Sequence, residues 1–241
     1  METILVLAHT EADGSLGKAA LETLGAAKTL SASLAGSTLV VGLIGTEVQA
    51  AANQIAAAGA ARLLGVAGAE FAQPRYSSDV LAVEALGKAA AATIILAPAT
   101  SRMNRVLAGA TQRLGGRIDT HATGIAAADG KPAVTRWNYR QRMEAVLSRT
   151  QRPWAVALES GCSAAFAGAA GQASIELVSV ALPAAHQRTT VTGIQAPSAD
   201  EQTIRPDAKL LFVAGAGWTK KQADGQAHAA EAEQIILGFL G

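Results

Sequence analysis

A run near the end of the chain could hold a phosphate group, and its residues are Gly215, Ala216, Gly217, Trp218 and, after one more position, Lys220. An apolar segment at residues 209–214 precedes this run, and a helical pattern at about residues 223–239 follows it. Glycines between a strand and a helix permit a tight turn, and backbone N–H groups at a helix start can bind a phosphate. Position 220 is lysine, not the third glycine of a G-x-G-x-x-G motif, so a plain tight turn stays an open alternative.

The other residue types that carry chemistry are few and scattered. The histidines are His9, His121, His186 and His228, and they show no H-x-x-x-H spacing. His9 follows an expected strand, so it is either a ligand or base at the carboxyl edge of a sheet or an ordinary histidine there. The sequence contains no G-x-S-x-G, no P-loop and no calcium-loop motif, and it suggests no hydrolytic triad. We therefore predict neither a catalytic residue nor a metal site.

The single cysteine, Cys162, excludes an internal disulfide and a zinc site built from cysteines. It lies in a stretch rich in glycine, alanine and serine, at residues 160–171. This setting favours a small residue in a loop over a catalytic thiol.

Arginines gather in one short stretch, with only Glu144 to balance them: Arg136, Arg140, Arg142, Arg149 and Arg152. Alternation along strands would place several of them on one face. They could form a docking patch or a phosphate clamp. They could equally be charges that protect strand edges from aggregation. Both interpretations stay open, and we expect residues 136–152 and the loop after Leu96 to contribute to a protein–protein surface.

The composition bounds the class of protein. In 241 residues, hydrophobic types make up 50% and charged types 16%, and the formal net charge is +1. This balance allows a sizeable core and argues against a nucleic-acid or acidic-membrane binder. No run approaches the ~18 apolar residues of a membrane span. Because a strand is expected almost at the first residue, we expect no leader peptide and a cytoplasmic location.

The first 115 residues alternate between strand and helix patterns. Strands are expected at residues 4–8, 38–44, 62–66 and 93–97, and helices at about residues 16–33, 47–58 and 78–91 and after Thr100. The strands are continuously apolar, which is typical of parallel strands buried on both faces. Pro98 ends the fourth strand, and Thr100 or Ser101 can cap the helix that follows. The pattern predicts a parallel, helix-covered sheet in which the loop after the fourth strand is a docking point.

The alternation of strand and helix patterns ends after Ile118. Segments at residues 120–128, 133–139, 142–149 and 154–159 have strand length, and we expect them to add antiparallel strands to one edge of the sheet. Two more extended segments are expected at residues 175–182 and 187–194. The predicted class is therefore α/β, a parallel sheet with flanking helices extended by antiparallel strands. The predicted domains are residues 1–195, a linker at 196–207, and the start of a second domain at 208–241.

Four pieces in order along the chain resemble the α subunit of the electron transfer flavoproteins. The first is the opening strand, followed by a loop with Gly14-Ser15-Leu16. The second is Leu96-Ala97-Pro98-Ala99-Thr100, followed by Arg113-Leu114-Gly115 and Asp119. The third is Arg136 to Tyr139, where the family has Arg-x-x-Tyr before Ala-Gly-Asn; here Arg140-Gln141-Arg142 replaces Ala-Gly-Asn. The fourth is residues 209–217, which resemble the first strand and Gly-rich turn of the family's FAD-binding domain.

The resemblance implies a Rossmann-type fold like that of the adenine nucleotide alpha hydrolases. It also implies an FAD cofactor, a β subunit as partner and a partner dehydrogenase as electron donor. It describes an electron carrier rather than an enzyme with its own substrate, and it assigns cofactor binding to the turn at residues 215–218 with Lys220. The family's arginine in this turn is absent, and its later flavin signatures do not occur. We therefore expect that this chain alone does not retain FAD. The alternative is a docking or nucleotide-sensing module of the same fold without flavin. A third class is a hydrolase or ligase of this fold, but it would need a phosphate loop after the first strand, and the sequence has none there.

Overall fold

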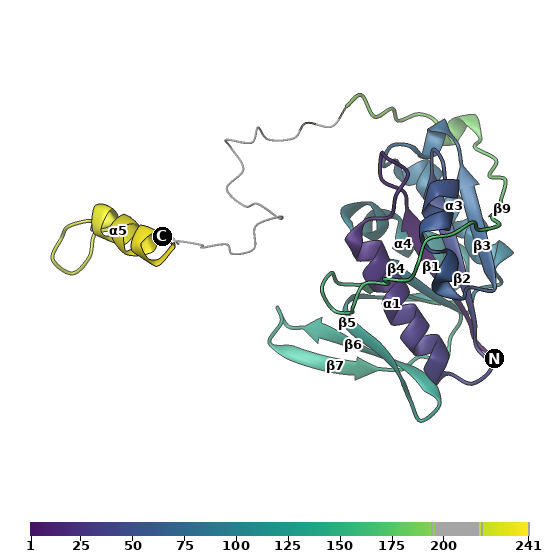
Figure 1. The fold of residues 1–241 in the computed structure, drawn as a ribbon, viewed down its shortest axis with the longest axis horizontal. Coiled ribbons are helices and arrows are strands. Elements are labelled where there is room, and N and C mark those ends of the chain that lie inside the picture. Colours follow the sequence, from purple (N-terminus) through teal and green to yellow (C-terminus); the bar gives the residue numbers. More distant parts are fainter. Residues whose placement is uncertain (194, 196–216, 218, 241) are drawn as a thin grey trace. The chain divides into compact units, whose positions relative to one another are not determined.

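The computed structural model describes residues 1–193, 195, 217 and 219–240, and it divides into two units, Met1–Thr192 and Gly193–Gly241 (Figure 1). Each unit is considered by itself. In the first unit the described residues build one sheet of nine strands, in the order β7-β6-β5-β8-β4-β1-β2-β3-β9.

The centre of the sheet is parallel and apolar. It contains β1 (Thr3–His9), β2 (Thr38–Gly45), β3 (Arg62–Ala67) and β4 (Ile94–Pro98), with β1 between β4 and β2. Every residue of β4 is buried, as expected for a strand covered on both faces. The four strands predicted for this half of the chain are confirmed, each to within a residue or two at its ends.

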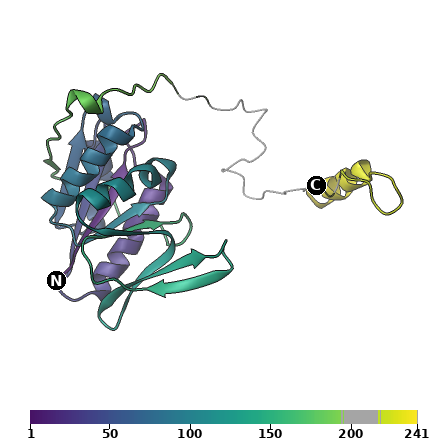
Figure 2. The same ribbon diagram turned by 180° about the vertical axis from the view of Figure 1, so that it is seen from behind.

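Helices cover both faces of this centre. One face packs against α1 (Lys18–Ser33), α2 (Gln49–Gln54) and the short 3-10 helix η1 (Ala56–Ala58). The other face packs against α3 (Tyr76–Ala89) and α4 (Ser101–Arg113), with η2 (Ala69–Phe71) nearby; Figure 2 shows α4, in teal, on the near side. Alternate residues of β1 supply the two cores, since Ile4 and Val6 belong to the first and Leu5 and Leu7 to the second.

Of the helices α1 to α4, only α4 begins at a side-chain cap, and α2 and α3 begin at Gln49 and Tyr76 instead of the predicted residues 47 and 78. Thr100 caps α4, since its side chain accepts a hydrogen bond of 3.3 Å from the backbone N–H of Met103. Gly59, at φ 74°, ends η1 in the left-handed conformation expected of a terminating glycine. The helix predicted from Leu16 begins instead at Lys18, because Leu16 is held in a bridge with Thr10 and by Gln54, whose Oε1 accepts from its N–H at 2.8 Å.

The prediction for the segments after Ile118 was partly wrong. Strands β5 (Arg117–Ala128), β6 (Lys131–Asn138) and β7 (Met143–Leu147) do form an antiparallel ribbon at one edge. Strand β8 (Trp154–Leu158), however, inserts between β4 and β5 and runs parallel to both. All five of its residues are buried. Because a strand with two apolar faces needs covering on both sides, β8 belongs in the centre of the sheet and not at its edge.

A long irregular segment leaves β8 and crosses the face covered by α1 and α2; in Figure 1 it is the green segment in front of α1. It is anchored where Gly161 N–H donates to Glu22 at 2.8 Å and where Phe166 N–H donates to the Leu21 carbonyl at 2.9 Å. The loop predicted at residues 160–171 is thus confirmed. The extended segment predicted at residues 175–182 is reduced to a two-residue strand, β9 (Glu176–Leu177), beside β3.

The segment predicted as extended at residues 187–194 has no strand in its described residues; a 3-10 helix, η3 (Ala184–His186), precedes it. In the second unit, α5 (Ala229–Leu240) begins later than the predicted residue 223. The reason is a turn at Asp224-Gly225, where Gly225 has φ 79° and the N–H of Gln226 donates to the Asp224 carboxylate at 2.9 Å. The strand predicted at residues 209–214 lies outside the described residues.

Candidate functional site

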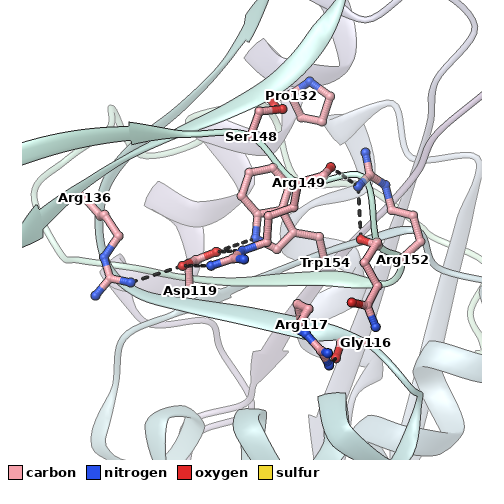
Figure 3. Close-up of polar contacts among 10 residues, drawn as sticks. Gly116, Arg117, Asp119, Pro132, Arg136, Ser148, Arg149, Arg152 and Trp154 are labelled. Carbon is pink, nitrogen blue, oxygen red and sulfur yellow. Dashed lines mark hydrogen bonds and ion pairs between the residues drawn. The ribbon is translucent and has the colours of Figure 1, made fainter.

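A buried carboxylate organises the arginine-rich flank of the sheet. Asp119, on β5, is 1% exposed and receives hydrogen bonds from three side chains (Figure 3). Arg149 donates from Nε to Oδ2 and from Nη2 to Oδ1, the latter at 2.8 Å, and Arg136 donates to Oδ1 at 3.1 Å. The indole Nε1–H of the fully buried Trp154 donates to Oδ2 at 2.9 Å. We name these four residues the Asp119 cluster.

The cluster connects the ribbon of β5, β6 and β7 to the neighbouring strand β8. Asp119 comes from β5, Arg136 from β6, Trp154 from β8, and Arg149 from the segment just after β7. The hydrogen bonds from Arg149 are the main reason why the pKa of Asp119 lies below its ordinary value; burial opposes them, and Trp154 and Arg136 add to the lowering. The carboxylate is therefore charged at neutral pH and holds the ribbon in one orientation against the sheet.

The arginine stretch thus divides into two groups, which the sequence did not separate. Arg136 and Arg149 bind Asp119, while Arg152 pairs with Glu2 and lowers the pKa of that carboxyl. Arg140 and Arg142, at the turn between β6 and β7, are exposed, and their guanidinium groups make no hydrogen bond or ion pair to the residues that the structure describes. The guanidiniums of Arg136, Arg149 and Arg152 have acidic partners within the chain, which limits their part in a docking patch or a phosphate clamp. Arg140 and Arg142 have no such partner among the described residues and are the more available for docking.

A large groove opens beside the Asp119 cluster. Its volume is about 1090 Å³, and we name it the hairpin groove; residues on its walls include Asn104, His121, Thr123, Arg136, Trp137, Tyr139, Arg140, Glu159 and Cys162. These residues come from α4, from a bulge in β5, from β6 and the β6–β7 turn, and from the loop after β8. The bulge is centred on His121, whose φ is 55°, and the pairing of β5 with β8 shifts register between Asp119 and Ala122.

The wall at the β6–β7 turn has an unusual backbone. Three successive residues adopt the left-handed conformation: Tyr139 at φ 52°, Arg140 at φ 55° and Gln141 at φ 63°. None of the three is glycine, and such residues cost roughly 1 kcal/mol or more each in this conformation. The turn therefore holds these side chains at the groove against a local preference, in the place where the family resemblance expects Ala-Gly-Asn.

A second, smaller hollow lies where the carboxyl ends of β1 and β4 meet. It has a volume of about 320 Å³, and its walls include His9, Lys18, Thr100 and Arg102. Strand β1 has β2 on one side and β4 on the other, so this is the switch point at which ligands bind in open α/β sheets. The loop predicted to dock ligands after β4 contributes Thr100 to it. We name this hollow the switch-point crevice.

His9 is at the crevice, as predicted from its place after the first strand. Its Nε2 is buried and has no hydrogen-bond partner in the described structure. Burial, with a smaller contribution from the nearby charge of Arg102, lowers the pKa of His9 to about 3. Arg102 itself is held by Asp79, with Nε 2.7 Å from Oδ2. A neutral imidazole here can accept or donate one hydrogen bond, but it is not a cationic phosphate ligand at neutral pH.

The remaining residues considered from the sequence lie elsewhere. Cys162 is half-buried on the loop after β8, and burial raises the pKa of its thiol, which favours the protonated form over a nucleophilic thiolate. His121 pairs with Glu159, Nδ1 to Oε1 at 2.9 Å, rather than with the adjacent Asp119. His186 is in η3, and His228 contacts Asp224 and Glu231 at the start of α5.

Of the predicted cofactor residues, Gly215, Ala216 and Trp218 lie outside the described residues. Gly217 and Lys220 are exposed, and their carbonyls both accept hydrogen bonds from the Gln222 side chain, at 3.0 and 3.3 Å. Gly217 also borders a hollow of about 450 Å³ with Gln222, His228 and Glu231. The assignment of these five residues to a cofactor stays a prediction.

A mostly parallel sheet with helices on both faces and a crevice at its switch point defines a Rossmann-like α/β protein. Comparison with known protein families identifies the family within this class. The family model described as the electron transfer flavoprotein domain matches residues 4–183, which is well over half of the chain. The chain therefore belongs to the electron transfer flavoprotein family. No curated protein matches its sequence significantly. Within the described residues, no helix has the length and apolar character needed to cross a membrane.

Two features of the site escaped the sequence interpretation. The Asp119 cluster had one visible signal, a single acidic residue near the start of a strand-length segment that precedes an excess of arginine, but spacing gave no pairing between them. The insertion of β8 had a clearer signal, because Trp154 to Leu158 is a continuous apolar run like those of the central strands.

Proposed function

We propose that this protein is an electron transfer flavoprotein α subunit, or an α-like paralogue, that works as a heterodimer with a β subunit. In this role it passes electrons from a partner dehydrogenase to an acceptor by way of FAD, and it has no substrate turnover of its own. The observation that carries the proposal is the family match over residues 4–183. The order of the α-like segments, above all Leu96 to Thr100, supports the choice of subunit. The proposal includes a cytoplasmic location.

We further propose how the chain is divided. Residues 1–195 are the N-terminal α/β domain of the subunit, residues 196–207 are a linker, and residues 208–241 are the first strand and helix of an FAD-binding domain. The turn at residues 215–218, with Lys220, would approach a phosphate of the cofactor. This role rests on the family resemblance and on the order of apolar segment, glycines and helix.

The described residues of the second unit do not by themselves fit an FAD molecule. A dinucleotide occupies a crevice between two halves of a doubly wound sheet, and these residues contribute one helix and a turn. The hollow beside Gly217 contains the Glu231 carboxylate, which lies 3.2 Å from His228, and Asp224 also contacts this histidine. Carboxylates at this position disfavour a diphosphate. We therefore derive no electron-transfer step from these residues.

The test is the visible absorption spectrum of the purified protein. The 241-residue chain is expressed alone and together with a β-type subunit, free flavin is removed, and the ratio of flavin to protein is recorded. We expect a ratio well below one for the chain alone. A heterodimer that retains flavin supports the electron-carrier role; a ratio near one for the chain alone would overturn the expected lack of FAD in this chain.

We propose that the exposed arginines of the β6–β7 turn favour encounter with the β subunit. Rim charges mainly change the association rate and its salt dependence. Replacing Arg140 and Arg142 together by Glu should weaken co-purification at low salt more than at high salt. The control is Arg113→Glu, which reverses one charge on an exposed arginine of α4 that pairs with Glu84. Association that is the same for both variants at every salt concentration would remove the turn from the interface.

The second candidate function is a docking or nucleotide-sensing module of this fold without flavin. The switch-point crevice favours it, because the crevice places Lys18 and the unpartnered His9 Nε2 where this fold class binds ligands. A stable heterodimer without flavin, combined with saturable binding of a mononucleotide to the chain, would favour this function over electron transfer.

A further inference from the structure

One guanidinium on the wall of the hairpin groove, that of Arg136, is only partly paired. Arg136 uses Nη1 to bind Asp119, but its Nε is buried and makes no hydrogen bond in the described structure. Buried guanidinium donors are costly to leave unpaired. Asp119 does not accept a hydrogen bond from Nε as well, since both its oxygens already accept bonds from Arg149 and one also accepts from Trp154. Arg136 lines the groove, so a ligand there would meet a guanidinium whose donors Asp119 satisfies only in part.

A second guanidinium on the groove wall is also available. Arg140 makes no hydrogen bond or ion pair to the described residues, and the left-handed turn fixes its backbone at the groove. Such strain is typical of segments where a function determines the conformation. Two guanidiniums with unpaired donors, one on β6 and one in the turn that follows it, line one groove. They suit an oxyanion with more than one charged group, since guanidinium binds carboxylate and phosphate in matched geometry.

The acidic groups near the groove hydrogen-bond to other side chains and disfavour an anion only in their own vicinity. Glu159 lies on the wall, but its Oε1 is 2.9 Å from His121 Nδ1. Glu144 is on β7, and its Oε1 accepts a long hydrogen bond of 3.4 Å from the Thr123 hydroxyl. Neither carboxylate contacts Arg136 or Arg140. The volume of about 1090 Å³ leaves room beside Trp137 and Tyr139 for the organic part of a ligand.

We propose that the hairpin groove binds a small, multiply charged oxyanion, with the guanidiniums of Arg140 and Arg136 as its ligands. Two sources share this chemistry, an organic phosphate and a di- or tricarboxylate. The site is separate from the switch-point crevice. It concerns the first unit alone, so it stands whether or not the protein carries flavin.

The experiment is a titration of the full 241-residue chain with pyrophosphate and with citrate, followed by two-dimensional NMR of backbone and indole N–H groups. Ionic strength is held constant with sodium chloride. We expect saturable shifts of the Trp137 indole and the Arg140 amide with at least one of the two anions. Tighter binding of pyrophosphate indicates a phosphate source, and tighter binding of citrate indicates a carboxylate source.

Matched variants separate a built site from general attraction. Arg140→Gln should weaken binding about tenfold or more, because a charge-assisted bond is lost. Arg142→Gln removes the same charge from the same turn but outside the groove wall, so it should leave the affinity unchanged. Arg140→Lys, which keeps the charge but loses the planar fork, should fall between the two. The absence of saturable shifts with either anion, or an equal loss in the Arg140→Gln and Arg142→Gln variants, would overturn the proposal.

Discussion

The centre of the sheet and its β5–β6–β7 flank are positioned by different forces. In the centre, β1, β4 and β8 are apolar on both faces, and nearly every residue is buried between helices. In the flank, burial is partial, and Met143 and Val146 on β7 are 57% and 71% exposed. What fixes the flank is one carboxylate, Asp119, and the donors that converge on it.

This difference predicts how the stability of each region responds to mutation. Apolar burial is spread over many side chains, so the centre should lose stability in proportion to the volume that a mutation removes. A charged cluster concentrates its contribution in a few atoms, so the flank should fail when a single partner is removed. The hairpin groove depends on the flank, because Arg136 belongs to both.

The strongest way to break the flank is Asp119→Ala. The variant leaves Arg136, Arg149 and the Trp154 indole without their acceptor, and losing one partner of a buried charged group costs about 3–5 kcal/mol. We expect this loss in the free energy of unfolding measured with urea. The Arg142→Ala variant, an exposed arginine of the same stretch, should change stability by less than about 0.5 kcal/mol. A loss below about 1 kcal/mol for Asp119→Ala would mean that the cluster does not hold the ribbon.

The centre is tested by Leu96→Ala. Leu96 on β4 is fully buried, so the lost contacts and the cavity should cost about 2–5 kcal/mol. Ile4→Val on β1 removes a single methylene group and should cost about 0.5–1.5 kcal/mol. Both values come from urea denaturation. Unlike the loss at Asp119, these losses should be insensitive to salt, and a strong salt dependence would argue against the contrast between the two regions.

His9 is a polar exception at the end of the apolar centre, and it makes stability depend on pH. Its folded-state pKa is lowered from 6.5 to about 3, so folding favours the neutral form and stability falls as pH drops below 6.5. Each pH unit in this range costs up to about 1.4 kcal/mol, which gives roughly 2–3 kcal/mol by pH 4.5. The lowered pKa of Asp119 acts only below its ordinary value of 3.8.

The measurement is the free energy of unfolding between pH 7 and pH 4.5 for the native chain and for His9→Gln. The variant should lose most of the pH dependence in this window, because no imidazole has to be protonated on unfolding. Equal slopes for both proteins would show that His9 is accessible to solvent and titrates normally.

The smallest effect is expected at the start of α4. Thr100→Ala removes the side-chain acceptor of the Met103 N–H and should destabilise the protein by about 1 kcal/mol. Thr100→Ser keeps the hydroxyl and should retain most of the stability. Thermal denaturation of the three proteins measures the difference. If Ala and Ser behave alike, the cap contributes nothing to the position of this helix.

The sequence by itself determined the four central strands, a cap at Thr100 or Ser101, the loop after β8 and the family. These features depend on local properties: continuous apolar runs, capping residues and short motifs are readable without knowing which segments meet. Only the tertiary structure decided that β8 lies between β4 and β5, that Arg136 and Arg149 face inward to Asp119, and that Arg140 is left at a groove. Strand order and the pairing of charges depend on contacts between residues far apart in the chain, and for Asp119 and Arg149 thirty positions separate two groups that are bonded in the fold.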